Sequence, residues 1–397
     1  MAKIMIAHSL YPPDMIGGAE VSTQILAQTI NRQYEVQVMT VGGHNDSQVR
    51  TDIVNGINVI RLPYNNRYWI GEHGRNSSVL NKVVWRVRDI FNFRQYQHIK
   101  KHLTEHKPDL VHTHNLAGLS LAMWRAAHEL NIPVVHTIHD FALIDPIKIP
   151  AYSKMYRLIS KRFSRMTASV IGVSNHILGT HTSLGLFENS TKHVIYNIVD
   201  NNPCAAERYK EKKVNTSGPM IVGYFGQLTD VKGVDHLIRA VKALGPDIVE
   251  KLYIFGDGPL LDSLKECALP DHRIEFKGKI PKTDVMKYMA AVDLVIVPST
   301  WNEPFGLVVI EAYQVGTPVY ASRVGGMAEI LLNTEKYSFQ PNSSEDITRS
   351  ILEYFHMSES EKVALKEQCH QYSLTFNESY QLQKHADVYD RLIGCGG

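Results

Sequence analysis

The feature that most constrains the fold of this chain is a regular alternation of short apolar strands with longer helical segments. In the first half, six segments have the apolar and β-branched composition of buried strands: Lys3–Ala7, Glu35–Thr40, Asn58–Leu62, Leu110–His112, Val134–Ile138 and Val170–Val173. Four segments with helical periodicity separate them: Ala19–Ile30, Val79–His106, Leu119–Leu130 and Tyr152–Met166. Such alternation predicts a parallel sheet that binds its ligands at the carboxyl ends of the strands.

The second half repeats this rhythm, so we expect a second sheet of the same kind. Its predicted strands are Met220–Phe225, Lys251–Phe255, Arg273–Phe276, Leu294–Val297 and Thr317–Ala321, and its predicted helices include Val234–Leu244 and Thr283–Ala291. The intervening segment, 200–219, is polar and lacks apolar periodicity, which indicates an interdomain linker. A length of 397 residues also favours two domains.

Composition and cysteine spacing indicate the compartment. Hydrophobic residues make up 44% of the chain and charged residues 21%, as in ordinary soluble proteins. The apolar run in Met1–His8 is too short for a signal peptide, and polar side chains interrupt the uncharged stretch Met166–Phe187. The four cysteines (Cys204, Cys267, Cys369 and Cys395) show no C-x-x-C spacing or paired framework. We therefore expect a reduced cytoplasmic protein without a transmembrane segment.

Positive charge is concentrated in the first half. Residues 1–200 carry 21 Lys and Arg against 14 Asp and Glu, whereas residues 201–397 carry 21 against 26. Two basic clusters stand out, Lys82, Arg86, Arg88, Arg94, Lys100 and Lys101, and Lys148, Lys154, Arg157, Lys161, Arg162 and Arg165. Each cluster fits a surface for an anionic membrane, a surface for an anionic acceptor, or a solvated helix face. No nucleic-acid motif accompanies the charge, so we expect no nucleic-acid partner.

The stretch from Asn302 to Glu311 carries the most specific chemical signal. Glu303 and Glu311 lie eight residues apart, across the start of a predicted apolar helix. A carboxylate on an apolar helix is costly without a hydrogen-bonding partner, so a partner for Glu311 is expected. The backbone N–H groups of residues 305–307, at the start of this helix, favour an anion. Together these features predict a pocket for a ligand with both phosphate and hydroxyl groups.

Glycine-rich turns follow several of the predicted strands. Gly226 and Gly233 flank Lys232, which places an ammonium group beside exposed N–H groups and suits a diphosphate. A second turn, Gly256–Pro259, follows the next strand and is weaker evidence by itself. In the first half, Gly17 and Gly18 precede a helix and let the backbone approach a ligand closely.

Histidines gather in the first half, which holds 14 of the 19. His112 and His114 end one predicted strand, while His136, His139 and Asp140 end the next. Imidazole and carboxylate groups are metal ligands, but neither spacing specifies zinc. Hydrogen bonding to neighbouring loops explains such histidines equally well, and we expect no metal.

These motifs, in this order, make the chain resemble the retaining glycosyltransferases of family 4, whose signature is the E-x7-E of Glu303 and Glu311. The resemblance implies the GT-B architecture, an α/β fold of two Rossmann-like parallel-sheet domains that face a central cleft. The N-terminal domain would span 1–199 on the acceptor side, with 376–397 crossing back onto it. After the linker, 220–375 would form the domain that binds the nucleotide sugar.

The resemblance also implies roles for individual residues. The catalytic residues would be His114, contacting the transferred sugar, Lys232, stabilising the leaving diphosphate, and Glu303, orienting the sugar hydroxyls. The donor would be bound by Gly17, Gly18, Gln227, Gly258, Lys279, Phe305, Gly306, Leu307 and Glu311, with Glu311 on the ribose. His139 and Asp140 would lie on the acceptor side. Gln227 stands where the family usually has arginine, and an amide cannot neutralise a diphosphate.

The implied activity is transfer of a sugar from a nucleotide sugar, with a UDP-sugar expected, to an acceptor hydroxyl without a metal or another cofactor. The acceptor would be lipid-linked, a saccharide or a small molecule, in surface polysaccharide or glycolipid assembly, on the cytoplasmic face of an anionic membrane if the basic clusters contact lipid. Two alternatives stay open at this point. A nucleotide-sugar epimerase would share the architecture, although the E-x7-E pattern argues against it. A donor-binding scaffold with little activity would be consistent with Gln227.

Overall fold

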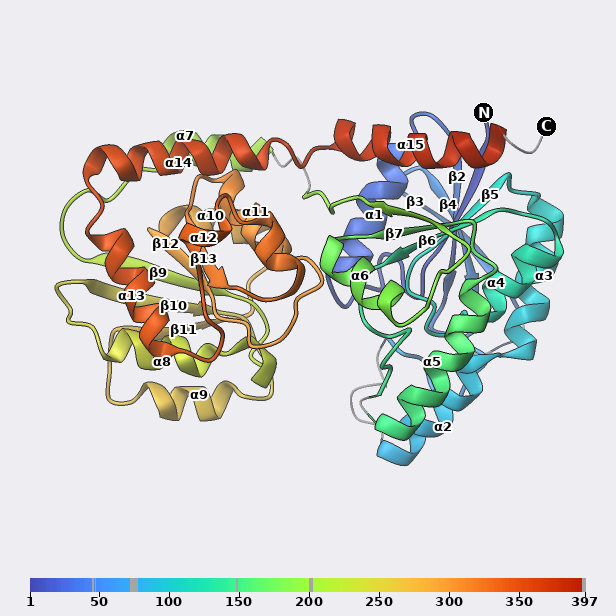
Figure 1. The fold of residues 1–397 in the computed structure, drawn as a ribbon, viewed down its shortest axis with the longest axis horizontal. Coiled ribbons are helices and arrows are strands. Elements are labelled where there is room, and N and C mark those ends of the chain that lie inside the picture. The colour runs from blue at the N-terminus through green and yellow to red at the C-terminus, as the bar shows by residue number, and fades with distance from the viewer. Residues whose placement is uncertain (45, 47, 72–77, 148, 200–202, 395–397) are drawn as a thin grey trace. The chain divides into compact units, whose positions relative to one another are not determined.

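The computed structural model describes residues 1–44, 46, 48–71, 78–147, 149–199 and 203–394. The chain divides into two compact units, Met1–Ile198 with Glu378–Gly397, and Val199–Asn377 (Figure 1). Each unit has one sheet with helices packed on it, which confirms the prediction of two parallel-sheet α/β domains. Lys148, Cys395 and the first residues of the expected linker, 200–202, lie outside the described residues.

The sheet of the first unit has eight strands in the order β3-β4-β2-β1-β5-β6-β7-β8. Their bounds are β1 Lys3–Ala7, β2 Glu35–Val41, β3 Arg50–Val54, β4 Ile57–Leu62, β5 Leu110–Thr113, β6 Val134–Ile138, β7 Ser169–Gly172 and β8 Thr191–Val194. All neighbours pair in parallel except β3, which runs antiparallel to β4 at one edge. The carboxyl ends of β1, β5 and β6 therefore lie side by side, all on the same side of the sheet along the strand direction.

Seven helices belong to the described part of this unit: α1 Gly18–Ile30, α2 Val79–Ile90, α3 Phe93–His106, α4 Ala122–Glu129, α5 Pro150–Ser164, α6 Asn175–Ser183 and α15 Glu378–Gly394. The single helix predicted over Val79–His106 is wrong, because the chain breaks between α2 and α3. Phe91 is extended, with φ −145° and ψ 96°, and the Asn92 side chain accepts a hydrogen bond from the backbone N–H of Gln95. Asn92 thus caps a new helix and satisfies a donor that would otherwise be unpaired.

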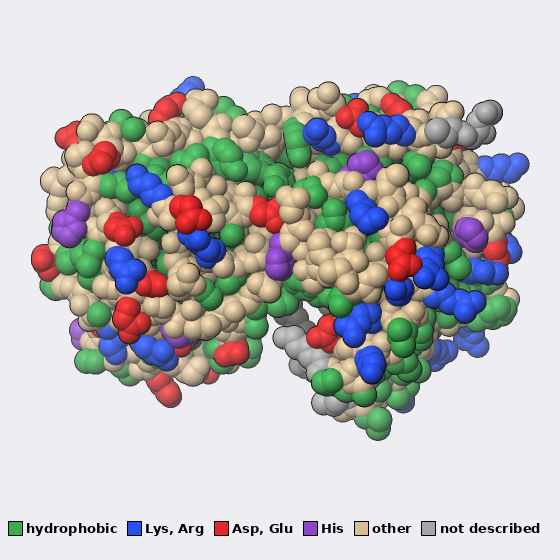
Figure 2. Space-filling model, viewed as in Figure 1, with side chains coloured by type: hydrophobic (Ala, Val, Ile, Leu, Met, Phe, Trp, Pro, Cys, Tyr) green, Lys and Arg blue, Asp and Glu red, His purple; other side chains and the backbone are tan. Residues whose placement is uncertain are grey.

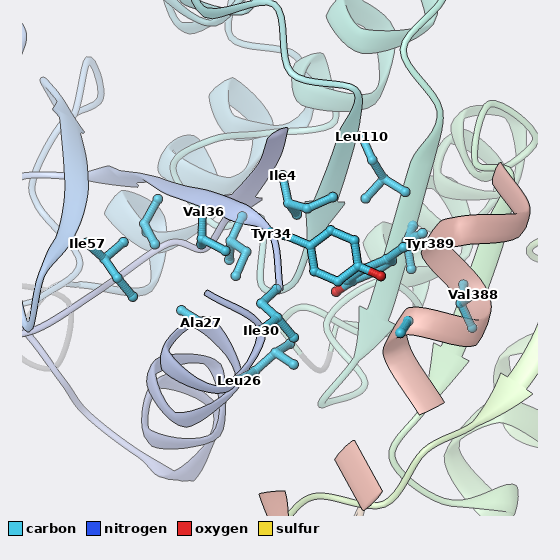
Figure 3. Close-up of a cluster of buried hydrophobic side chains, with 14 of the residues drawn as sticks. Ile4, Leu26, Ala27, Ile30, Tyr34, Val36, Ile57, Leu110, Val388 and Tyr389 are labelled. Atoms are coloured by element: carbon cyan, nitrogen blue, oxygen red, sulfur yellow. The ribbon is translucent and has the colours of Figure 1, made fainter. Parts of the chain in front are cut away.

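The last helix, α15, completes the core of the first unit. Val388 and Tyr389 of α15 pack against Leu26 and Ile30 of α1 in one buried cluster with residues of β1, β2 and β5 (Figure 3). The Tyr34 and Tyr389 rings meet edge to face, and the Tyr34 hydroxyl donates to Asp390 at 2.7 Å. Burial of a large aromatic side chain stabilises a fold by about 2–3 kcal/mol, so α15 is an integral part of this unit.

The sheet of the second unit has six parallel strands in the order β11-β10-β9-β12-β13-β14. These are β9 Met220–Phe225, β10 Val249–Phe255, β11 Ile274–Gly278, β12 Leu294–Val297, β13 Val319–Ser322 and β14 Ser338–Phe339. The helices are α7 Pro203–Glu211, α8 Val234–Lys242, α9 Leu261–Ala268, α10 Lys282–Ala291, α11 Leu307–Gln314, α12 Thr334–Tyr337, α13 Ser344–Phe355 and α14 Glu359–Ser373, with 3₁₀ turns η1 Asp230–Lys232 and η2 Gly325–Ile330.

The segment expected as an irregular linker contains a helix, α7, that packs against α10 and α11 of the second unit. Lys212, just after α7, is held there because its ammonium group donates to the carbonyls of Ala290 and Val292 at 3.0 and 2.6 Å. Burial lowers the pKa of Lys212 to about 8. Helix α7 is short and lacks a clear apolar stripe, which is why hydrophobic periodicity did not predict it. Among the helices that the structure describes, none is long and apolar enough to span a membrane.

Candidate functional site

An ion pair between Lys232 and Glu303 lies at the carboxyl end of the second unit's sheet. Lys232 ends η1, which follows β9, and Glu303 follows β12, the strand beside β9. The next residue, Gly233, has φ 61°, and a Cβ there would lie 2.2 Å from the carbonyl oxygen of Pro298. Glycine is thus required where the turn after β9 presses against the loop after β12, and this contact brings the two charges together.

The turn predicted to bind diphosphate, after β9, packs directly against the second glycine turn predicted at the donor, after β10. Gly256, with φ 134°, leaves no room for a side chain, because a Cβ would lie 1.8 Å from the carbonyl oxygen of Gly226. At Gly258 a Cβ would meet the carbonyl oxygen of Leu228 at 2.4 Å. The Leu228 N–H donates to the Asp257 carbonyl at 3.0 Å, which fixes the pair of turns. Gly258 therefore has a structural reason to be glycine in addition to its predicted place at the donor.

Glu303 is fixed by contacts to both its side chain and its backbone. The Ser299 hydroxyl donates to Oε1 of Glu303 at 2.8 Å, beside the Lys232 ammonium group. Its carbonyl oxygen accepts from the Gly326 N–H at 2.7 Å, and Gly325, with φ 55°, packs so closely that a Cβ would lie 2.3 Å from that oxygen. The glycine pair after β13 thus holds the Glu303 loop, while the second carboxylate oxygen of Glu303 has no hydrogen-bond donor among the described residues.

Glu311 lies in α11, whose first residue follows Gly306 at φ 117°. Burial raises the pKa of the Glu311 carboxyl, and only the charge of Lys282 acts in the other direction. No hydrogen bond joins Glu311 to any residue in the described ranges, so the partner expected for this carboxylate is not one of their side chains or backbone groups. An acceptor held in this way without a donor is suited to the hydroxyl groups of a ligand.

The other residues predicted to bind the donor differ in how deeply they are buried. Phe305 is buried, whereas Gly306 and Leu307 are half-buried at the start of α11. Gln227 and Lys279 have exposed side chains, after β9 and β11 respectively. Arg323, a cation just after β13, does not replace the arginine that is missing at Gln227, because it is bound elsewhere. Its guanidinium group donates to Glu335 at 3.0 and 2.9 Å and to Ser338 at 2.9 Å.

In the first unit, three histidines meet where β1, β5 and β6 end. His114 Nδ1 lies 2.9 Å from His139 Nε2, and the His8 ring is 6.0 Å from the His114 ring. One imidazole of this pair donates the hydrogen bond and the other accepts it. His114 is buried, and its Nε2 has no hydrogen-bond partner among the described residues. This pair thus leaves one imidazole nitrogen available for a ligand at the edge where such sheets bind one.

The neighbouring histidines have structural partners. His112 Nδ1 and Nε2 lie 2.6 Å from the Tyr389 hydroxyl and 2.7 Å from the Thr137 hydroxyl, and His136 Nδ1 lies 2.9 Å from the Thr113 hydroxyl. The His112 ring is tilted against the His114 ring, with centroids 4.2 Å apart, so α15 reaches the candidate site through Tyr389 and His112.

Burial keeps this histidine cluster neutral. It lowers the pKa of His8 to about 3 and that of His139 to about 4, and the charges of neighbouring histidines act in the same direction. The pKa of His114 is also held well below the usual value of an imidazole, mainly by burial. The site therefore offers neutral hydrogen-bonding groups and no positive charge near pH 7.

The glycine loop and Asp140 occupy the same edge of the first sheet. The Gly17 N–H donates to the Glu20 carboxylate at 2.8 Å, so the first turn of α1 carries its own anionic cap. Burial raises the pKa of Glu20 despite its backbone hydrogen bonds. Asp140 Oδ1 accepts from the Ala142 N–H at 2.8 Å, and burial likewise raises its pKa. Gly18 is exposed at the first position of α1.

A possible metal-ligand grouping in the described residues lies elsewhere. His102, Glu105 and His106 on α3 have ligand atoms within 4.8 Å of one another. Because β5 starts just after α3 ends, this group is at the amino ends of the strands, opposite His114.

Three contributors to the candidate site were missed by sequence reasoning. His8 follows the first predicted strand, and its position at a carboxyl end was an available signal. Ser299, which binds Glu303, follows β12 in the same way. Glu20 stands at the third position of α1 after a glycine cap, a spacing typical of a capping box.

Comparison with known proteins assigns each half to a family model. The model for Glycosyltransferase Family 4 matches residues 16–202, and the model for Glycosyl transferases group 1 matches residues 205–372. An uncharacterised 42.6 kDa protein in the cps region of Klebsiella pneumoniae is 33% identical over 342 residues, covering 83% of this chain and 87% of that protein. The putative teichuronic acid biosynthesis glycosyltransferase TuaC of Bacillus subtilis is 25% identical over 290 residues, covering 72% of this chain and 67% of TuaC.

Solved structures with the same fold cover nearly the whole chain. HepE from Anabaena, in complex with UDP and glucose, has a TM-score of 0.69 and 22% identity, covering 98% of this chain and 100% of HepE. WaaG, a glycosyltransferase of lipopolysaccharide biosynthesis, has a TM-score of 0.62 and 19% identity, covering 99% of this chain and 100% of WaaG.

Proposed function

We propose that this chain, which belongs to glycosyltransferase family 4 and has the GT-B fold, transfers a sugar from a nucleotide sugar to an acceptor hydroxyl with retention of configuration. The observation that carries the proposal is the Lys232–Glu303 ion pair, which stands beside the two interlocked glycine turns. A cation next to turns of this kind suits a diphosphate, and a fixed carboxylate suits sugar hydroxyls. The epimerase alternative does not fit this family membership.

The second unit would bind the donor. Glu311 would accept hydrogen bonds from the ribose hydroxyls, which would supply the partner that its buried carboxylate lacks. Glu303 would orient hydroxyls of the transferred sugar through the carboxylate oxygen that Lys232 and Ser299 leave available. The N–H groups of residues 305–307 would bind phosphate or sugar oxygens, and the turns at Gln227, Gly258 and Lys279 would line the nucleotide. UDP is the nucleotide that we expect in the donor, since HepE, a protein of this fold, is known in complex with UDP and glucose.

In the transfer step, the bond from the anomeric carbon to the diphosphate breaks, and the acceptor oxygen bonds to the same face of that carbon. Attack from the same face requires no protein nucleophile, and the acceptor proton passes to a diphosphate oxygen, so the step requires no protein base. Negative charge grows on the leaving diphosphate, and the Lys232 ammonium group would stabilise it, which makes the step independent of a metal ion. Because Gln227 stands in place of arginine, Lys232 would provide more of the stabilisation of this negative charge.

The first unit would supply the acceptor side. His114 would contact the transferred sugar through Nε2, the nitrogen that has no partner among the described residues. His139 would hold that ring in place through the 2.9 Å contact to Nδ1, and Asp140 would face the acceptor. The glycine loop at Gly17 and Gly18 would approach both substrates.

For the biological setting, we propose assembly of a surface polysaccharide or glycolipid at the cytoplasmic face of the membrane. The support is the relative in a Klebsiella cps region, the similarity to TuaC, and the basic first half. The acceptor would then be lipid-linked, and the protein would associate with the membrane peripherally.

The test is a thermal-shift series on the full chain with UDP, GDP and ADP and their common sugars, with and without EDTA. We expect one nucleotide series to raise the melting temperature, because a ligand that binds only the folded state stabilises it. The donor that stabilises the protein is then incubated without acceptor, and NMR identifies the anomer of the slowly released sugar. Release of the anomer found in the donor supports retention.

Three results would contradict the proposal. Absence of any shift at millimolar nucleotide argues against an intact donor site. A shift that EDTA abolishes argues against metal independence. Donor binding without transfer to any acceptor in a polysaccharide-producing cell extract would favour the scaffold alternative, and Gln227 would then be the first residue to restore to arginine.

A further inference from the structure

Helices α2 and α5 expose a mixed apolar and basic surface on the first unit. Six of the large apolar side chains that are exposed in the described residues fall on α2, on α5 or at the start of α3, and Leu80 and Leu158 are 71% and 65% exposed. We define the α2–α5 surface by the exposed side chains Leu80, Val87, Arg88, Phe91, Lys154, Met155, Leu158 and Arg162. Apolar groups gathered on one face in this way usually mark an interaction site.

The two helices are neighbours in the fold, so their exposed side chains form one surface. The Phe91 ring, at the end of α2, lies 6.0 Å from the Phe163 ring of α5. Arg86 of α2 also acts electrostatically on Tyr152 and Tyr156 of α5. In Figure 2, Lys and Arg side chains lie beside hydrophobic ones over the region that Figure 1 labels α5.

The charge of this surface is mainly positive. α5 contains no acidic residue, and the acid of α2, Asp89, is buried. The exposed Asp145 accepts a hydrogen bond from Ser153 near the start of α5. Arg88, Lys154 and Arg162 form no ion pair with the described residues, whereas Lys161 and Arg165, further along, are paired with Glu188. Exposed cations that outnumber the acids, beside exposed leucine and phenylalanine, complement the anionic headgroups and acyl chains of a bilayer surface.

We propose that the α2–α5 surface docks this protein onto an anionic lipid bilayer. The apolar side chains would enter the headgroup region, and the cations would contact lipid phosphates. The proposal rests on the proposed function in one respect, the lipid-linked acceptor, because docking would keep the enzyme where that acceptor is.

The structure also connects this surface to the candidate sugar site within the same unit. Both oxygens of the Asp89 carboxylate, near the end of α2, accept the Gly118 N–H, at 2.9 and 3.1 Å. Gly118 belongs to the loop that follows His114, and Ser120 in that loop accepts the Asn92 N–H at 3.3 Å. The docking helix and the His114 loop are therefore tied together, so the membrane would hold the site at a fixed depth.

The experiment is co-sedimentation of the full chain with vesicles of phosphatidylcholine alone or with about a third phosphatidylglycerol, at low and high salt. We expect binding to the anionic vesicles that weakens with salt. Leu158→Asp and Arg162→Glu should each weaken it by at least about fivefold, since each change introduces a negative charge at the bilayer. The matched controls, Leu374→Asp and Lys265→Glu, alter exposed residues of the second unit and should leave binding unchanged.

Three outcomes would overturn the proposal. One is failure of the wild-type chain to bind anionic vesicles. Another is equal binding by the Leu158 and Arg162 variants. A third is a wild-type dimer in light scattering that Leu158→Asp dissociates, which would make the surface an interface between copies. The nucleotide thermal shift is recorded on the same proteins. Vesicle binding without a nucleotide shift would reject the proposed function alone, and the reverse would reject the docking alone.

Discussion

The ammonium group of Lys232 is bound to the carboxylate of Glu303, although 71 residues separate them in the chain. The pairing follows from sheet order, since β9 and β12 are adjacent and the turn after one strand packs on the loop after the other. Without substrate, each charge neutralises the other. A diphosphate would draw Lys232 toward itself and leave Glu303, still held by Ser299, for sugar hydroxyls.

Lys232→Ala should therefore reduce turnover much more than donor binding. We expect kcat to fall by about 10²–10³-fold, as when one group that stabilises a developing charge is removed, with a smaller change in the affinity for nucleotide. Steady-state kinetics and nucleotide titration measure the two effects. Lys265→Ala, at an exposed position of α9, is the control. A variant with wild-type kcat would remove Lys232 from the mechanism.

Glu311→Gln should stabilise the protein without ligand and weaken its binding of nucleotide. The carboxylate is buried without a hydrogen bond from the described residues, so a neutral amide should raise the free energy of unfolding by roughly 1 kcal/mol. Losing the charged hydrogen bonds to ribose should cost about 1.5–3 kcal/mol of binding, or about 10- to 150-fold in Kd. Melting curves with and without nucleotide report both quantities, and Glu353→Gln on exposed α13 is the control. Wild-type affinity in Glu311→Gln would show that ribose does not contact this side chain.

The strands at the centre of each sheet could be predicted because their sequences are short segments rich in apolar and β-branched residues. Val134–Ile138 and Leu294–Val297 form β6 and β12 with the predicted bounds. The edge strand β3, at Arg50–Val54, was missed because most of its side chains are exposed and its pattern is not that of a buried strand. The break between α2 and α3 depends on Asn92 and its contacts to a distant loop, which no local periodicity encodes.

For the candidate site, the sequence could predict the individual residues but not the contacts between them. Glu303, Glu311, Lys232 and His114 could be selected from motifs and from positions after strands. Their partners could not, because the contacts of Lys232 to Glu303 and of His114 to His139 depend on which strands are neighbours. Glu311 differs, because its sequence context predicted that it needs a partner and the described residues provide none, which leaves that role to a ligand.

Acidification should destabilise the fold through its buried histidines. Burial lowers the pKa values of His139, His181 and His385 to about 4, whereas an unfolded chain protonates near 6.5. Between these values the unfolded state binds protons that the folded state does not, so the free energy of unfolding falls as pH falls. The slope is about 1.4 kcal/mol per pH unit for each such histidine.

Denaturant unfolding at several pH values between about 7 and 5 measures this slope. His181 is stacked on Phe141 and has no proposed contact with substrate, so His181→Gln should reduce the slope by the contribution of one group. His272→Gln, at an exposed position, should leave it unchanged. Equal slopes in the wild type and His181→Gln would mean that His181 does not contribute to the acid sensitivity.

Gln227→Arg should strengthen binding of the nucleoside diphosphate. The side chain is exposed on the turn after β9, where the family usually has arginine, so a guanidinium group can be added there without repacking the core. A new charge-assisted contact to the diphosphate should tighten binding by about tenfold at low salt. Because the position is exposed, high salt should remove most of the gain. Calorimetric titration at two salt concentrations measures the change, with Gln97→Arg on exposed α3 as the control for added charge. Equal tightening by both variants would indicate a general effect of net charge, whereas no tightening by Gln227→Arg would place the diphosphate out of reach of this turn and leave Lys232 as its main cation.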